Sequence, residues 1–93
     1  MRIIGYIEHP QLKITVFKMN NKLSVKFESG LYEQTYKFRE SEDLKNIEQM
    51  KHLVDNQLII QVEQGLAQMH QIKNQALSRY LPPVEDNEFD TLI

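Results

Sequence analysis

Three histidines are the residues of this 93-residue chain whose chemistry best suits metal binding or proton transfer. His9 lies beside Pro10 in an expected turn, whereas His52 and His70 would lie about five turns apart on a continuous helix. That separation prevents the two from sharing an ion, and the chain has no cysteine to complete a zinc site. We therefore expect structural or surface histidines, no metal or other cofactor, and a protein that is not an enzyme.

A second chemical candidate is a set of basic residues interleaved with aromatic ones. Residues 1–39 carry seven Lys and Arg against three Glu, a net charge of +4, while the rest of the chain has a net charge of −6. Cations that follow phosphates and aromatic rings that stack on bases would suit single-stranded nucleic acid. The alternative is a solvated sheet face whose lysines discourage edge aggregation. The candidate residues are Arg2, Tyr6, Lys13, Phe17, Lys22, Lys26, Lys37 and Arg39.

A third candidate is an apolar stripe at helical spacing near the end of the chain. It comprises Leu58, Val62, Leu66, Met69, Ile72, Ala76 and Tyr80. A helix over residues 55–81 would be about 40 Å long, whereas strands of eight residues span about 26 Å. The last three turns must overhang the sheet, fold back, or pack on another chain. We expect the last outcome, in a homodimer or with another protein, through Met69, Ile72, Ala76, Leu77 and Tyr80.

Three turns in the first half of the chain predict a four-stranded antiparallel meander. Asn20-Asn21 suits a two-residue hairpin turn and pairs Met19 with Lys22 and Ile14 with Phe27. The other two turns are expected at Ser29-Gly30 and over residues 8–11. They give the pairs Phe27 with Tyr32, Leu23 with Tyr36, Lys26 with Glu33, Ile7 with Leu12, and Ile3 with Val16. All three hairpins place apolar residues on one face, with Arg2, Ile4 and Tyr6 on the other.

Three residues can begin a helix after the strands: Ser41, Asn46 and Asp55. One long helix or a short helix followed by a long one is therefore expected, ending before Pro82-Pro83. We predict a single domain over residues 1–81 and a flexible acidic tail over residues 82–93. In that tail, Phe89, Leu92 and Ile93 are candidate docking residues, and a solubilising terminus is the alternative.

Two residues interrupt these patterns. Gln34 falls among apolar positions on the inner sheet face, so its amide must bond a buried group or lie where the helix does not cover the sheet. Gly65 interrupts the helix at a cost of about 1 kcal/mol relative to alanine. A close crossing of helix and sheet, or a hinge, would explain the glycine.

Composition and segment lengths favour a cytoplasmic protein. The chain is 41 % hydrophobic and 26 % charged, which is ordinary for a globular domain. No apolar run has the length of a signal peptide core or of the ~20 residues that cross a membrane.

Segments at residues 9–15, 30–37 and 53–55 resemble a group of short, uncharacterised bacterial proteins. That resemblance implies no activity. The expected order, four strands and then a long helix, is similar to the purine-rich-element-binding (PUR) repeat and to Whirly-type modules. It implies single-stranded nucleic-acid binding and dimerisation, without assigning a binding residue. We expect an α+β domain, a four-stranded antiparallel meander with a C-terminal helix packed on one sheet face. Its expected function is as a non-enzymatic interaction or oligomerisation module, with nucleic-acid binding as the alternative.

Overall fold

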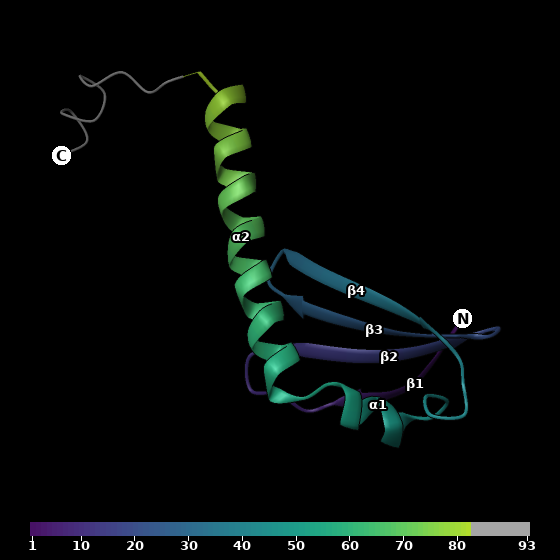
Figure 1. The fold of residues 1–93 in the computed structure, drawn as a ribbon. Coiled ribbons are helices and arrows are strands. Elements are labelled where there is room, and N and C mark those ends of the chain that lie inside the picture. The colour runs from purple at the N-terminus through teal and green to yellow at the C-terminus, as the bar shows by residue number, and fades with distance from the viewer. Residues whose placement is uncertain (83–93) are drawn as a thin grey trace.

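The computed structural model describes residues 1–82 and confirms the predicted α+β fold (Figure 1). Four strands, β1 (Arg2–Ile7), β2 (Lys13–Met19), β3 (Lys22–Ser29) and β4 (Tyr32–Arg39), form an antiparallel sheet in the order β1-β2-β3-β4. Two helices follow, α1 (Ile47–Leu53) and α2 (Asn56–Tyr80). Of the two expected helix arrangements, the structure has the short helix followed by the long one.

The central hairpin has the predicted register. Met19 pairs with Lys22, Val16 with Val25, and Ile14 with Phe27. Asn20 adopts a positive φ of 54°, the conformation for which asparagine is favoured in such turns. The turn residues and the alternation of apolar side chains require the same register here, so the sequence alone specifies the pairing of β2 with β3.

The β3–β4 register differs from the prediction by two residues. The turn is formed by Gly30 and Leu31, with Gly30 at a φ of 60°, so Phe27 pairs with Gln34 and Val25 pairs with Tyr36. The predicted pairs of Phe27 with Tyr32, Leu23 with Tyr36 and Lys26 with Glu33 are therefore wrong. The predicted faces are nevertheless kept, because a shift of two residues preserves the alternation of side chains.

The β1–β2 pairing contains a bulge that the sequence pattern does not predict. Ile7 pairs with Ile14 rather than Leu12, and the register shifts between Ile3 and Gly5. The extra residue reverses the faces before it, so Ile4 packs on the core while Ile3 is 49 % exposed. The predicted pairing of Ile3 with Val16 and the outward placement of Ile4 are wrong.

The helix caps decide between the three predicted starts. The Asn46 side chain accepts a hydrogen bond from the Gln49 N–H, and Asp55 accepts one from the Leu58 N–H, both at 2.9 Å. Ser41 does not begin a helix. Instead its backbone forms a bridge with Leu44, with both N–H to O distances at 3.1 Å.

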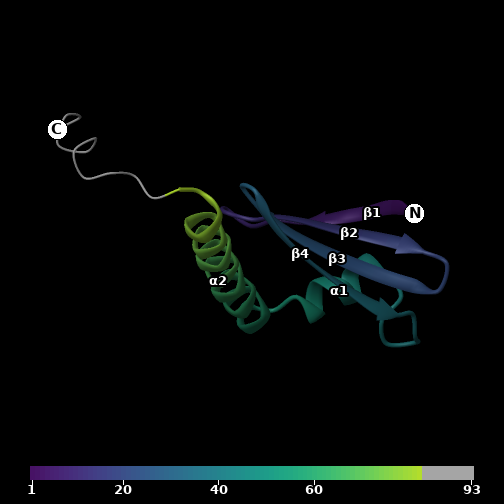
Figure 2. The same cartoon turned by 90° about the horizontal axis from the view of Figure 1, so that it is seen from above.

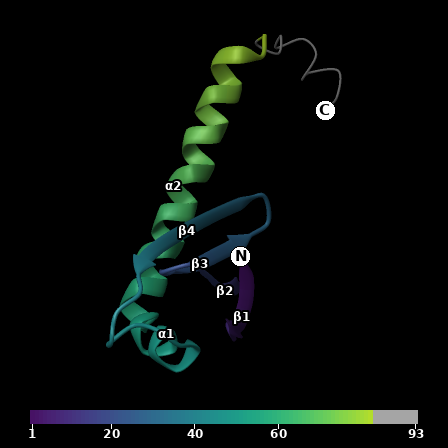
Figure 3. The same cartoon turned by 90° about the vertical axis from the view of Figure 1, so that its right-hand side faces the viewer.

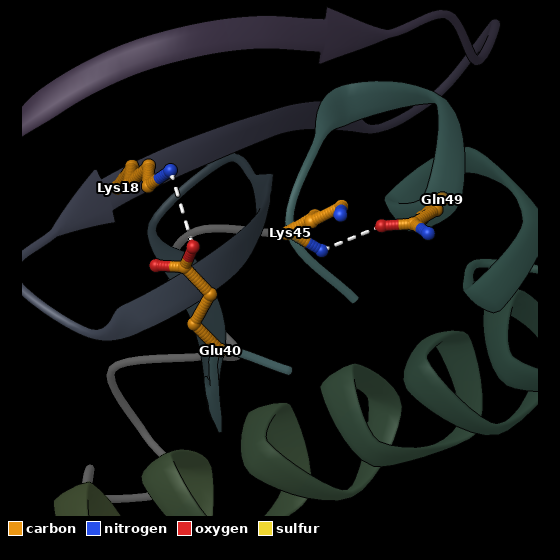
Figure 4. Close-up of polar contacts among 4 residues, drawn as sticks. All are labelled: Lys18, Glu40, Lys45 and Gln49. Carbon is orange, nitrogen blue, oxygen red and sulfur yellow. Dashed lines mark hydrogen bonds and ion pairs between the residues drawn. The ribbon is translucent and has the colours of Figure 1, made fainter. Parts of the chain in front are cut away.

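Polar contacts hold the connection between β4 and α1 in place. Lys18 on β2 lies 3.5 Å from the carboxylate of Glu40, which follows β4 (Figure 4). The Gln49 side chain accepts a hydrogen bond from the Lys45 N–H at 2.6 Å and donates one to the Glu42 carbonyl at 3.1 Å. Gln49 therefore fastens the loop onto the start of α1.

The core lies between one sheet face, here called the inner face, and the two helices. Both helices lie on the same side of the sheet, with α1 beside β1 and α2 across the strand ends (Figures 1 and 2). Gly5 permits close approach of α1, because a Cβ there would lie 2.8 Å from the Ile47 side chain. The buried residues are Leu12, Ile14, Val16, Leu23, Val25, Phe27, Met50, Val54, Val62 and Leu66.

Candidate interaction surfaces

Helix α2 crosses the sheet at β4 and then continues beyond it. Val62 and Leu66 are buried against the sheet, and Met69 packs at the margin of the core. Past β4 the helix projects free of the sheet (Figures 1 and 3). We call residues 71–80 the overhang. The sequence prediction that α2 is too long for its own sheet is confirmed.

The overhang carries an exposed apolar stripe, made of Ile72, Ala76, Leu77 and Tyr80. At about 100° per residue, these side chains fall within the face that includes Val62 and Leu66, so the stripe prolongs the buried face of the helix. Ile72 is 57 % exposed and Tyr80 is 84 % exposed. Four of the five predicted contact residues therefore lie on the overhang, and Met69 lies at its base.

A glutamine and a glycine fix the point at which α2 crosses β4. The Gln34 amide donates to the Val62 carbonyl at 2.9 Å, and its oxygen accepts from the Tyr36 hydroxyl at 2.7 Å. A Cβ at Gly65 would lie 2.5 Å from the Gln34 nitrogen, so only glycine leaves room for this amide. The predicted hydrogen bond of Gln34 and the predicted close crossing at Gly65 are both confirmed.

A polar cluster marks the corner where α2 leaves the sheet. The Tyr32 hydroxyl and Nδ1 of His70 share a hydrogen bond of 2.6 Å, and Nε2 of His70 lies 3.1 Å from the Asn74 amide nitrogen. The Lys73 ammonium lies 5.2 Å from the centre of the Tyr32 ring. Sequence reasoning missed this cluster, because only the crossing of α2 over β4 brings Tyr32 and His70 together.

Two of the histidines make hydrogen bonds within the fold, His70 in the polar cluster at the corner and His9 in the β1–β2 loop. Nδ1 of His9 accepts hydrogen bonds from the N–H groups of Gln11 and Leu12, each at 3.1 Å, and so closes the β1–β2 loop. Among residues 1–82, no group of three or more His, Asp and Glu side chains is placed to hold a metal ion. In the same part of the chain, neither helix combines the length and apolar character needed to cross a membrane.

The outer sheet face carries most of the residues predicted for nucleic-acid binding. Cross-strand partners share a face, so the register groups Tyr6 with Lys26, Phe17 with Lys37, and Lys22 with Arg39. Lys13 lies at the end of this face, opposite Glu28. Arg2 pairs with Lys18 on the opposite side of the sheet from Phe17, so its predicted outward placement is wrong.

The central cation of the outer face is already engaged. The Lys26 ammonium lies 3.4 Å from the Glu33 carboxylate, 3.7 Å from that of Glu28, and 5.9 Å from the centre of the Phe17 ring. Three other cations, Lys22, Lys37 and Arg39, gather at the end of the face away from Lys13, around a pocket of about 220 Å³ that Phe38 also lines. The basic surface is therefore a local cluster rather than a continuous track along the sheet.

The candidate docking residues Phe89, Leu92 and Ile93 lie outside the described residues, as does the rest of the acidic segment after Pro82. Their docking role stays a prediction.

No protein-family model, curated protein or solved structure matches this chain. The resemblances to short bacterial proteins and to PUR and Whirly-type modules stay predictions.

Proposed function

We propose that the protein is a non-enzymatic, cytoplasmic self-association module that forms a homodimer by burying the apolar stripe of the overhang. One observation carries this proposal: the face of α2 that is buried at Val62 and Leu66 continues past the sheet as exposed Ile72, Leu77 and Tyr80. Burial of apolar surface is favourable by about 25 cal/mol of free energy per Å² removed from water. Exposed apolar residues that share one helix face are typical of an interface.

A second copy is the partner we propose, because each copy offers both the stripe and a surface to receive it. On the inner face of β4, Tyr36 is 40 % exposed and Phe38 is half-buried, although their β3 partners Val25 and Leu23 are fully buried. The helices leave this end of the inner face open. A self-complementary pair of surfaces is what a two-fold dimer requires.

The test is the solution mass of a variant with two charges in the stripe. Ile72→Glu combined with Leu77→Glu should give monomers in light scattering at concentrations where the wild type is dimeric, since each charge would enter an apolar interface. Met69 is left unchanged because it packs on the chain's own core. The control is Gln71→Glu with Gln75→Glu on the opposite, polar face of the same turns, which should stay dimeric. A wild type that is monomeric at high micromolar concentration would refute the proposal.

Single-stranded nucleic-acid binding is the second candidate function. The cluster of Lys22, Lys37 and Arg39 beside Phe17 favours it, because cations and an aromatic ring share one surface. Anisotropy of a labelled oligonucleotide at low salt should then rise with protein and fall with salt. Lys37→Glu should weaken binding, while Lys51→Glu on α1 should leave it unchanged. Absence of binding near physiological salt would exclude this function.

A further inference from the structure

The free edge of β4 lies beside the overhang. β4 is an outer strand of the sheet, and α2 passes over it between Val62 and His70 before projecting beyond that edge (Figures 1 and 3). A strand added next to β4 would therefore lie under the overhang. The free edge of the sheet and the exposed apolar face of the overhang are therefore on the same side of the molecule.

The β4 edge is also suited to pairing. The strand runs for eight residues without a register shift, whereas the other edge, β1, is broken by its bulge. The Glu40 N–H donates to the Asn21 carbonyl at 2.7 Å, which continues the ladder with β3. In an antiparallel ladder alternate residues point their N–H and C=O groups away from the partner, so those of Glu33, Thr35 and Lys37 point outward.

The overhang alone is too small to form a stable interface between two copies. A helical segment about 15 Å long and about 10 Å wide offers a footprint on the order of 200 Å², well below the ~800 Å² per partner of a stable interface. The β4 edge and the open inner face around Tyr36, which is 40 % exposed, add to the surface that a second copy could bury.

We propose, building on the proposed homodimer, that two copies pair their β4 strands antiparallel about a two-fold axis at Thr35 and so form one continuous eight-stranded sheet. The charge pattern supports this register. Glu33 of each copy lies opposite Lys37 of the other on the outer face, while on the inner face Tyr32 lies opposite Phe38 and Gln34 opposite Tyr36. Each overhang then covers the inner face of the second copy near Phe38 and Tyr36.

A single cysteine at the two-fold axis tests this arrangement, since the natural chain has none. Because Thr35 points its N–H and C=O outward, the two copies of residue 35 would form a hydrogen-bonded pair with Cα atoms about 5.5 Å apart, within the Cα range of a disulfide. Thr35→Cys should therefore cross-link into a dimer under mild oxidation. Lys37→Cys is the control, because the two copies of residue 37 would lie about 13 Å apart and should stay unlinked.

Exchanging the charges of Glu33 and Lys37 gives an independent test of the β4 pairing, and it needs no oxidation. Glu33→Lys or Lys37→Glu alone places like charges opposite each other at two symmetric positions and should raise the dimer dissociation constant about tenfold. The double exchange, Glu33→Lys with Lys37→Glu, should restore most of the wild-type affinity. A dimer that forms normally but neither cross-links in the Thr35→Cys variant nor responds to the exchange would overturn β4 pairing and leave overhang-mediated association standing. A monomeric wild type would remove both proposals.

Discussion

The two halves of α2 carry the same apolar pattern, but the first half packs on the sheet and the second half is exposed. In the first half, Val62 and Leu66 are buried against the sheet, and Gln34 fits against Gly65. In the overhang the same face is exposed from Ile72 onward. The difference arises from the width of the sheet, not from the helix, since four strands at about 4.8 Å spacing cannot cover a 25-residue helix of about 37 Å. Periodicity therefore identifies the apolar face of a helix but not how much of that face its own sheet covers.

The largest effect should come from the sheet core on which the first half of α2 packs. Phe27 is fully buried on the inner face and packs edge-on to Tyr36, so Phe27→Ala should lower the free energy of unfolding by about 3–5 kcal/mol. Lys26→Ala, on the outer face, should cost less than about 1 kcal/mol because its ion pairs are solvated. Urea denaturation measures both, and equal costs would show that the strand faces are wrongly assigned.

The same substitution in the two halves of α2 tests the comparison itself. Leu66→Ala should cost about 2–4 kcal/mol in unfolding free energy, because it leaves a cavity against the sheet. Leu77→Ala in the overhang should cost less than about 0.5 kcal/mol when measured at dilutions that favour the monomer. A large cost for Leu77→Ala under those conditions would mean that the overhang folds back onto its own sheet.

Gly65→Ala tests the crossing point between the two halves. Helix propensity alone predicts stabilisation by about 1 kcal/mol. The added Cβ, however, would displace the Gln34 amide from the Val62 carbonyl and from Tyr36, which costs about 1–3 kcal/mol for a lost hydrogen-bond partner. We expect net destabilisation of about 1 kcal/mol in chemical denaturation. A more stable Gly65→Ala protein would show that Gln34 does not fix the crossing.

An effect of about the same size as that of Gly65→Ala should come from the N-cap at the start of the buried half. Asp55→Ala removes the side chain that accepts from the Leu58 N–H and should cost about 1 kcal/mol of unfolding free energy. Asp55→Asn keeps an oxygen acceptor and should cost only a few tenths. If both substitutions cost the same in thermal denaturation, the charge of Asp55 matters more than its hydrogen bond.

The sequence predicts the elements of this fold better than their exact pairing. Asn20-Asn21 specifies its hairpin, since a two-residue turn with positive φ and the apolar face require the same register. At Gly30 the same face pattern allows two registers, and the positive φ of the glycine selects the turn. The bulge at Ile4 brings this side chain onto the core, and a contact of that kind cannot be predicted from the local sequence pattern.

The candidate surface is predictable in part. The length of the apolar stripe is enough to predict an overhang from the sequence, because helix rise and strand rise are constants of the backbone. Which strand edge lies beneath it follows only from the crossing at Gln34 and Gly65. The pairing of Tyr32 with His70 likewise depends on that crossing.

Hydrogen exchange along α2 at two protein concentrations tests the central claim most directly. Amides near Val62 and Leu66 should be protected at all concentrations, whereas those from Ile72 to Tyr80 should gain protection between about 5 and about 500 µM as the dimer forms. The overhang and the outward amides of β4 should change together. An overhang whose exchange rates are unchanged across that range would contradict the account, since the apolar stripe would then have no second copy to cover it.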